Sequence, residues 1–420
     1  MTDDLLVVGG GIEGYVTATV AAREEPALDV RLLTPEESRF RRETGLLDVL
    51  GYVAGTEGPV AKPLEHIRDL PAFHPYQLLG TEWLQESLSW FDSLTGDSYR
   101  GDGTEANALV CTAAGYPKPT ARYPASVAPG VLSEDSKMLL VGFDRITGFD
   151  AYYVGDSISR YVPFSTSGVS VTFPVDFEVH PPGPRMASAL DDNEETEDGT
   201  PLREALVDDL HRYLDIEPRV GFPAVLGLRA QSAVRDELSS RMSARVFEIP
   251  VGPPNVPGLR LEALLQEAAL NAGVVVETGT PVDHTASGSR VESVEVDGSE
   301  AGSFEARQCV LATGGLDAGG IVANRCGVTE PIFGCEVEHV GDRSQWVSEN
   351  PLGDQPFARF GVSVDEQLRP IGAEGNVEYD NLIAAGTVLS GGNFVAEQSS
   401  GGVALSTGYT AGVYAAERLV

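Results

Sequence analysis

The stretch DLLVVGGGIEG, residues 4–14, decides the fold of this 420-residue chain. Residues 4–8 are a short apolar run, typical of a buried strand, and glycines follow at once. An Ala- and Val-rich stretch, typical of a helix, then runs to about residue 22, and a second apolar run covers residues 30–33. This order predicts a βαβ unit and an α/β class, with a Rossmann-like nucleotide-binding fold.

The glycines of the turn follow the dinucleotide fingerprint. Gly9 makes the tight turn, Gly11 lets the backbone approach a pyrophosphate, and Gly14 lets helix and strand pack closely. Free N–H groups at the helix N-terminus favour a phosphate there. The second strand ends at Thr34, where an acid would hold a ribose, so the spacing leaves open a full dinucleotide or a shorter flavin mononucleotide.

Two later strand ends are also glycine-rich, one before Thr313-Gly314 and one before Gly386-Thr387. Small residues at a strand end let backbone lie against a cofactor. Gly401-Gly402 then opens a last helix over about 402–419, whose positive end would face a flavin ring. We therefore expect a flavin bound by residues from both ends of the chain: Gly9, Gly10, Gly11, Gly14, Thr34, Thr313, Gly314, Gly386, Thr387, Gly401 and Gly402.

Length and texture predict an interrupted domain, because single cores usually stop growing at roughly 250–300 residues. We expect a flavin-binding domain from residues 1–104 and 250–420, with an inserted cap domain at 105–249. Within the insertion, residues 191–198 are almost wholly acidic and polar, which predicts a disordered or solvated loop.

The charge balance excludes some partners. A net charge of -34 argues against nucleic acid and favours adaptation to high salt. No apolar run approaches the roughly 20 residues of a membrane span, and no secretory leader is evident, so we expect a cytoplasmic protein. The four cysteines lack the spacing of a zinc or iron–sulfur site, which favours isolated buried thiols and predicts no metal.

Five polar residues are candidates for a site beside the flavin. His74 is a possible base, although a lone histidine in a turn is more often structural, and Arg260 and Arg325 suit an anionic substrate. Glu330 and Gln398 are further candidates. None carries a catalytic signature, so the catalytic residues stay open.

Several segments resemble the B subunit of anaerobic glycerol-3-phosphate dehydrogenase. The resemblance is carried by GLLDVL (45–50), HPY (74–76), PGLR (257–260), VLATG (310–314) and the glycine-rich end from residue 381 to 403, among others, while residues 105–249 match loosely. It implies a flavoprotein, generally with FMN, in a complex that oxidises sn-glycerol 3-phosphate to dihydroxyacetone phosphate. It also implies a catalytic A subunit and a membrane-associated iron–sulfur C subunit that passes electrons to quinone, which would hold this chain at the inner face of the membrane.

Two other functions stay open on the sequence alone. The first is a flavoenzyme related to fumarate reductase or aspartate oxidase, and the second is a non-redox scaffold that has lost its flavin. A fumarate reductase-like enzyme needs clustered arginines and a histidine in the cap, and residues 105–249 offer no clear set. The missing ribose acid and Thr387 in place of an acid make the scaffold conceivable.

Overall fold

A computed structural model describes residues 2–54, 56–101, 106–177, 182–214, 218–298, 301–350 and 355–420. The chain forms two compact units. Unit 1 comprises residues 1–39, 48–95 and 263–420, and unit 2 comprises residues 40–47 and 96–262. The expected cap segment, 105–249, falls in unit 2, and the expected boundary at residue 104 lies outside the described residues.

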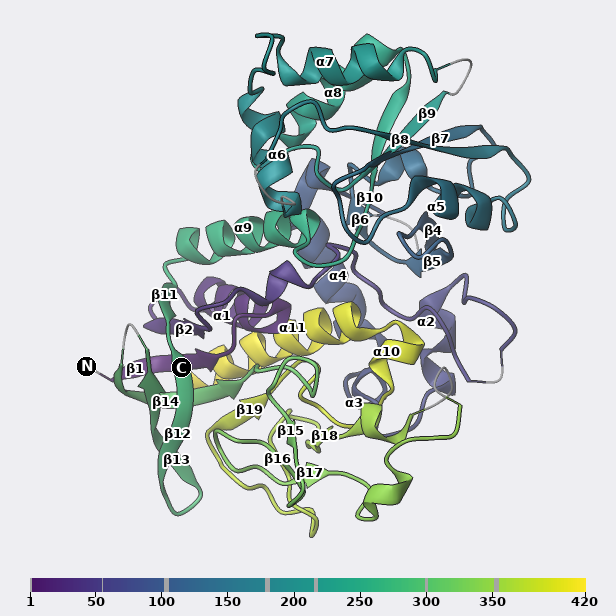
Figure 1. Ribbon diagram of the computed structural model, residues 1–420. Helices are drawn as coiled ribbons and strands as arrows, with labels where there is room; N and C mark the ends of the chain where they lie inside the picture. Colours follow the sequence, from purple (N-terminus) through teal and green to yellow (C-terminus); the bar gives the residue numbers. More distant parts are fainter. Residues whose placement is uncertain are drawn as a thin grey trace. The chain divides into compact units, whose positions relative to one another are not determined.

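Unit 1 is built on a seven-stranded sheet in the order β11-β2-β1-β14-β13-β12, with β19 beside β14 (Figure 1). Strand β14 pairs in parallel with β1 and β19, and β2 and β11 continue the parallel part beyond β1. Strands β12, β13 and β14 form an antiparallel meander. The bounds are β1 (Asp3–Val8), β2 (Val30–Thr34), β11 (Val275–Thr278), β12 (Thr280–Ser287), β13 (Arg290–Asp297), β14 (Gly302–Leu311) and β19 (Leu382–Ala384). The predicted α/β class and the βαβ start are confirmed.

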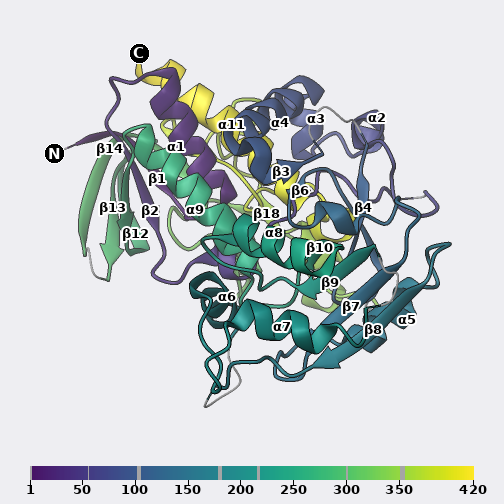
Figure 2. The ribbon, with the colours of Figure 1, turned by 90° about the horizontal axis from the view of Figure 1, so that it is seen from above.

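The central strand β1 is buried on both faces, which explains its continuous apolar run instead of an alternation. Its crossover helix α1 (Ile12–Glu24) is buried from Ile12 to Ala22. The last helix, α11 (Ser400–Leu419), packs along α1, and both views show the two helices side by side (Figures 1 and 2).

Glycines set the closeness of α1 and α11. A Cβ placed on Gly408 would lie 2.8 Å from the carbonyl oxygen of Glu13, and one on Gly412 would lie 2.8 Å from that of Thr17. The Thr17 hydroxyl donates to the carbonyl oxygens of Gly408, at 3.0 Å, and Glu13, at 2.7 Å. Gly408 and Gly412, four residues apart on α11, therefore fix how closely α1 lies to this helix.

The remaining elements of unit 1 are short, apart from α4, which packs with α3 on α11. They are α2 (Pro63–His66), α3 (Pro75–Leu79), α4 (Thr81–Thr95), α10 (Phe394–Glu397), the pairs β15 (Val322–Ala323) with β16 (Val328–Thr329) and β17 (Val337–Glu338) with β18 (Gly361–Val362), and the 3-10 turns Ile67–Asp69, Arg343–Gln345 and Pro356–Arg359. Boundaries between the two units fall inside two further elements. These elements are the 3-10 turn Arg39–Arg41 and the helix α9 (Val256–Asn271).

Unit 2 has its own parallel sheet, in the order β10-β9-β7-β8. Its elements are β7 (Met138–Phe143), α5 (Ala151–Ile158), β8 (Thr166–Val171), α6 (Gly183–Asp192), α7 (Leu202–Leu210), β9 (Arg219–Pro223), α8 (Gln231–Met242) and β10 (Arg245–Ile249), with the pairs β3 (Tyr99–Arg100) and β6 (Tyr123–Pro124), β4 (Ala108–Cys111) and β5 (Pro117–Thr120), and the 3-10 turns Gly96–Ser98 and Ala128–Gly130.

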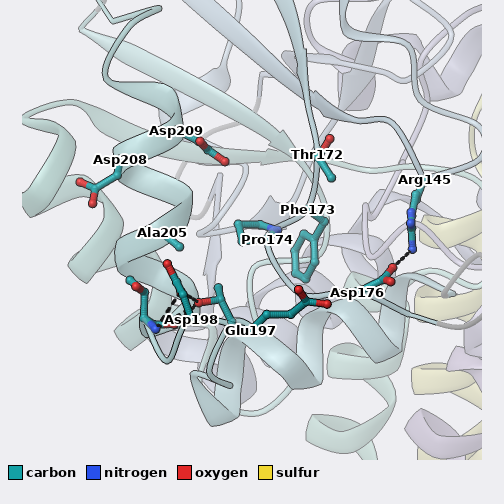
Figure 3. Close-up of a pocket in the computed structure, with 12 residues that line it drawn as sticks. Arg145, Thr172, Phe173, Pro174, Asp176, Glu197, Asp198, Ala205, Asp208 and Asp209 are labelled. Carbon is teal, nitrogen blue, oxygen red and sulfur yellow. Dashed lines mark hydrogen bonds and ion pairs between the residues drawn. The ribbon is translucent and has the colours of Figure 1, made fainter.

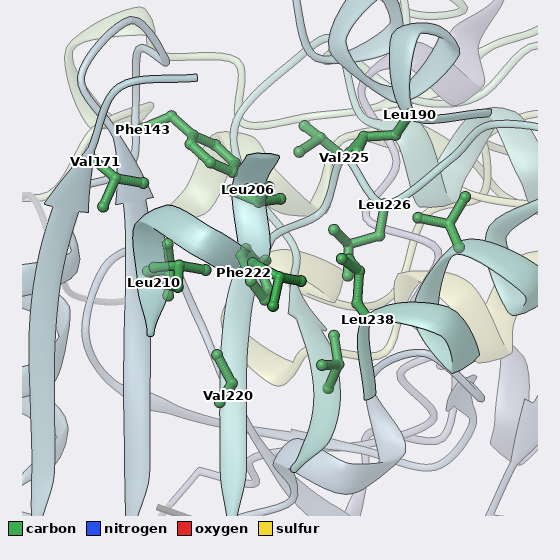
Figure 4. Packing of buried hydrophobic residues seen from close by; sticks show 14 of the residues in the cluster. Phe143, Val171, Leu190, Leu206, Leu210, Val220, Phe222, Val225, Leu226 and Leu238 are labelled. Carbon is green, nitrogen blue, oxygen red and sulfur yellow. The ribbon is translucent and has the colours of Figure 1, made fainter. Parts of the chain in front are cut away.

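Side chains of β7 alternate between two cores. Leu139, Val141 and Phe143 join the cluster shared with α6, α7 and α8, which Figure 4 shows around Phe222. Met138 and Leu140 join a second cluster with α5. Both faces of this sheet are therefore covered, as expected for a parallel sheet.

The prediction of a solvated loop at residues 191–198 is wrong at its start. Asp191 lies in α6 with a side chain only 2% exposed. Its carboxylate accepts the backbone N–H groups of Leu228, Arg229 and Ala230 at 2.8–2.9 Å, just ahead of α8. The acidic composition suggested that the Asp191 carboxylate is solvated. Instead, the carboxylate accepts hydrogen bonds from backbone N–H groups just before the N-terminus of a helix.

We predict that Gly408→Val destabilises the protein by about 1–3 kcal/mol, because the added carbons overlap the backbone of α1. Denaturant unfolding, followed by circular dichroism, measures this loss. Glu417→Val is the matched control, since Glu417 is exposed on the same helix. Equal stabilities of the two variants would contradict the close packing.

Candidate functional site

The glycine turn after β1 lies at the carboxyl edge of the unit 1 sheet. The N–H of Gly9 donates to the carbonyl of Leu33 at 2.9 Å, and the N–H of Ala312 donates to that of Val8 at 2.8 Å. Gly9 has a φ of +132°, and a Cβ on it would overlap the carbonyl oxygen of Ala312. Only glycine lets the ends of β1 and β14 approach this closely.

The other fingerprint glycines also lie against backbone or a neighbouring strand end. A Cβ on Gly14 would overlap the carbonyl oxygen of Gly9, and one on Gly10 would lie 3.0 Å from Cβ of Thr34. The Thr34 hydroxyl donates to the carbonyl of Glu277 at 3.2 Å. Thr34 therefore lies beside the turn, and its hydroxyl points to the neighbouring strand β11.

The two later glycine motifs meet at the same edge. The Thr387 hydroxyl accepts the N–H of Gly315 at 3.1 Å, so the exits of β14 and β19 are tied together. The N–H of Gly386 donates to the hydroxyl of Thr407, in α11, at 2.7 Å. Segments far apart in the sequence thus converge where ligands of open α/β sheets bind, beyond the carboxyl ends of the strands.

Two buried polar atoms near these segments have no hydrogen-bond partner among the described residues. They are Oγ1 of Thr313, after β14, and Oε1 of Gln398, just ahead of α11. Buried polar atoms are normally paired, so each orphan calls for an explanation. A bound polar ligand at this edge would supply one for the Thr313 hydroxyl.

The structure adds Glu13 and Arg39 to the site. Glu13 is 7% exposed, and its carboxylate lies against Gly11 and Gly386, since a Cβ on Gly11 would be 2.7 Å from Oε2 and one on Gly386 would be 2.6 Å from Cγ. Arg39 donates through Nη1 to the carbonyl of Thr313 at 2.5 Å. Sequence reasoning missed both, although Glu13 stands inside the fingerprint and Arg39 shortly follows β2.

Gly401 and Gly402 lie in the first turn of α11. The N–H of Gly402 donates to the carbonyl of Asp48 at 2.7 Å, so one donor of the helix start is already used. A Cβ on Gly402 would overlap the hydroxyl of Tyr76, which donates to the carbonyl of Val49 at 2.7 Å. Close packing of α11 on this buried tyrosine is one reason for glycine here.

His74 is fully buried ahead of α3. Its Nδ1 accepts the N–H of Tyr76 at 3.1 Å, and its Nε2 lies 3.2 Å from a carboxylate oxygen of Glu397. Because Nδ1 is an acceptor, the network assigns the proton to Nε2. Both ring nitrogens are thus engaged in holding α3 and α10.

Arg260 lies in unit 2, where it pairs with the buried Glu248. Its Nη1 is 2.6 Å from Oε2 of Glu248, and its Nε donates to the carbonyl of Gly227 at 2.9 Å. Burial alone would raise the pKa of Glu248, but the charge and hydrogen bonds of Arg260, together with hydrogen bonds from Ser126 and Leu226, outweigh it and leave the pKa lowered. This arrangement holds the β10 strand to the turn before α8.

The last two candidates lie in unit 1. Arg325 is exposed, between β15 and β16. Glu330 is buried, and its carboxylate accepts the N–H groups of Ile332, Phe333 and Cys335. Burial raises the pKa of Glu330 despite these bonds. Glu330 thereby holds a tight turn.

A separate pocket of about 690 Å³ lies in unit 2, lined by α7 and by loop residues, among them the segment that follows β8 (Figure 3). Its lining includes the carboxylates of Asp176, Glu197, Asp198, Asp208 and Asp209, with Arg145 paired to Asp176. The negative charge of these carboxylates repels anions, so the pocket does not suit a phosphate ester.

Cysteines and helices set further bounds. Cys111, Cys309 and Cys335 are buried thiols, but Cys326 is exposed, which corrects the expectation for that residue. Within the described ranges, no cluster of His, Cys, Asp and Glu could hold a metal ion. Among the same residues, no helix combines the length and apolarity that a bilayer crossing requires.

Comparison with known proteins places the chain. Residues 4–403 match the family model of an FAD binding domain. A probable B subunit of anaerobic glycerol-3-phosphate dehydrogenase from Halobacterium salinarum is 44% identical over 423 residues, covering 99% of this chain and 98% of the relative. The chain belongs to the family of anaerobic glycerol-3-phosphate dehydrogenase B subunits. The corresponding protein of Vibrio cholerae is 28% identical, over 97% of this chain and 95% of its own.

Comparison with solved structures finds more distant similarities. The FrdA chain of E. coli quinol fumarate reductase has a TM-score of 0.42 at 10% identity, covering 100% of this B-subunit family member and 70% of FrdA. A 3-ketosteroid-delta4-(5alpha)-dehydrogenase from Rhodococcus jostii has a TM-score of 0.40 at 13% identity, over 99% and 97% of the two chains. Family membership and strand order, not these likenesses, carry the fold assignment.

We predict that Arg260→Met lowers the unfolding free energy by about 3–5 kcal/mol at neutral pH, because it leaves Glu248 buried without its charge partner. Denaturant unfolding across pH measures the loss. The lowered pKa of Glu248 gives stability that is present above its unfolded value of about 4.3 and lost as the pH falls through the folded value. The deficit of Arg260→Met should therefore shrink towards acid pH.

Arg245→Met is the control for this variant, since its pair with Glu134 is largely exposed and worth no more than about 1 kcal/mol. An Arg260→Met protein as stable as the control would show that the buried pair contributes little. A substrate role for Arg260 would then regain support.

Proposed function

We propose that this chain is the FAD-carrying B subunit of a complex that oxidises sn-glycerol 3-phosphate to dihydroxyacetone phosphate and passes the electrons towards quinone. The observation that carries the proposal is the convergence of Gly9, Gly11, Gly314 and Gly386 at one sheet edge. Family membership supports the assignment of the reaction and of the complex.

The residues present fit a flavin dinucleotide. The pyrophosphate would lie against Gly11 and Gly386, where bare backbone forms a cradle at the N-terminus of α1. Arg39 provides a positive charge beside Gly314, and the orphaned hydroxyl of Thr313 gains a partner. The isoalloxazine ring would extend towards the N-terminus of α11, near Gln398 and Gly401. When bound, the flavin supplies hydride acceptance, and the protein orients it.

FAD fits better than FMN. The fingerprint places a phosphate-binding turn at the start of α1, and the matched family is that of an FAD binding domain. The usual acid at the end of β2 is replaced by Thr34, whose hydroxyl bonds to β11. The adenosine ribose would then rely on backbone contacts near the turn. FMN, which the family resemblance first suggested, is an outcome of the binding test.

We propose that the electrons leave this chain for another protein of the complex; the described residues themselves contain no ligand cluster for a metal centre. We propose that a catalytic A subunit and an iron–sulfur C subunit are the partners, and that the complex sits at the inner membrane face. Arg325, which is exposed, stays a candidate for contact with the anionic substrate, and His74 and Arg260 are better explained by their structural bonds.

A second candidate function is a scaffold that no longer keeps a flavin. It is favoured by one observation, the Glu13 carboxylate that fills the cradle between Gly11 and Gly386. Equilibrium dialysis of the purified chain against FAD and FMN, read by flavin absorbance and mass, separates the two. FAD bound at one per chain and more tightly than FMN supports the proposal. A chain that takes up neither flavin would support the scaffold.

We predict that Gly11→Val abolishes FAD binding in the same assay. The three atoms nearest to an added Cβ all belong to the flexible carboxylate of Glu13, so we expect the fold to survive while the cradle is filled. Gly302→Val is the control, because Gly302 has open space around it at the start of β14. Undiminished stoichiometric FAD in the Gly11→Val protein would refute the placement.

We propose adaptation to high salt from the net charge of -34. At molar ionic strength the Debye length is about 3 Å, so surface carboxylates repel one another little. We expect the melting temperature of wild type to rise steadily between low salt and molar KCl. A melting temperature that stays flat or falls over this range would contradict the adaptation.

A further inference from the structure

We propose that Glu13 is a built-in competitor of the nucleotide, whose carboxylate occupies the pyrophosphate cradle and must leave before FAD binds. The inference rests on the proposed function, because it concerns the same FAD site. It assigns to Glu13 control over flavin affinity.

The carboxylate fills the space that two glycines leave. A Cβ on Gly11 would lie 2.7 Å from Oε2 and 3.0 Å from Oε1 of Glu13. A Cβ on Gly386 would lie 2.6 Å from Cγ and 2.9 Å from Oε1 of the same side chain. One acidic side chain, 7% exposed, therefore lines both walls of the cradle.

The backbone of Glu13 cannot move aside, so only its side chain can. Gly408 of α11 lies against the carbonyl and Cα of Glu13, and Thr17 bonds to both residues. Gly14 is packed still more tightly on the carbonyl of Gly9. The helix start is thereby fixed on two sides, and opening of the cradle reduces to rotation of one side chain.

Charge makes the competition exclusive. The N-terminus of α1 favours one anion, and Glu13 already lies in this first turn as the acidic residue. A pyrophosphate in the same low-dielectric cradle would stand within a few ångströms of the carboxylate, and like charges at that distance repel strongly. Nucleotide and carboxylate therefore exclude each other by volume and by charge.

The test compares wild type, Glu13→Gln, Glu13→Ala and the control Glu24→Gln. Glu24 is exposed at the far end of the same helix, so its variant removes the same charge away from the cradle. Kd for FAD is measured by equilibrium dialysis, and Kd for ADP, which lacks the flavin, by calorimetry. Circular dichroism and melting temperature confirm that each variant is folded.

We expect both Glu13 variants to bind FAD and ADP at least about tenfold more tightly than wild type, with Glu24→Gln unchanged. Tighter binding by Glu13→Ala but not by Glu13→Gln also supports the inference. It would show that the volume of the side chain excludes the nucleotide, because glutamine keeps the size of the native side chain. Weaker binding in the variants would make Glu13 a nucleotide ligand and overturn the inference.

Equal affinities of wild type and both variants would overturn the inference while the proposed FAD site stands. Failure of every protein, Glu13→Ala included, to bind FAD or ADP would overturn the proposed function and the inference with it. The two failures are therefore distinguishable.

Discussion

Unit 1 depends on backbone approaching backbone where no side chain intervenes. At Gly9 and Gly14 a single added carbon would overlap a carbonyl oxygen, and Gly408 sets α11 against α1 in a similar way. These contacts fix the carboxyl edge of the sheet and the first turn of α1 relative to each other. The nucleotide site that we propose lies beyond that edge, where the backbone of Gly11 and Gly386 meets the carboxylate of Glu13.

Unit 2 is stabilised by different means. Its parallel sheet is covered on both faces by apolar clusters, and its buried charges are matched by specific partners. Glu248 with Arg260, and Asp191 with the N–H groups ahead of α8, are the clearest cases. Removing one partner from such a pair leaves a buried charge unpaired and lowers stability strongly, even where replacing both partners with apolar residues would change stability little. These residues therefore tolerate little single change.

The sequence predicts the elements of unit 1 well because their signals are local. The last helix, expected over about residues 402–419, begins two residues earlier, at Ser400. The glycine motifs were also readable, since tight turns leave few alternatives. Whether these glycines bind FAD stays a prediction.

The roles of individual charged residues were not readable, because they depend on partners distant in sequence. Arg260 resembles an anion-binding residue until Glu248 is placed beside it, and the acidity of Asp191 suggests solvent until three N–H groups surround it. Glu13 was passed over as part of a glycine motif, yet its carboxylate lies between Gly11 and Gly386. Only the three-dimensional convergence of the chain exposes these relations.

A structure of the chain determined with FAD tests the central claim most directly. We expect the pyrophosphate to lie against Gly11 and Gly386, with the Glu13 side chain rotated out of the cradle and Arg39 nearby. FAD bound away from this sheet edge, with the Glu13 carboxylate still between the two glycines, would contradict it.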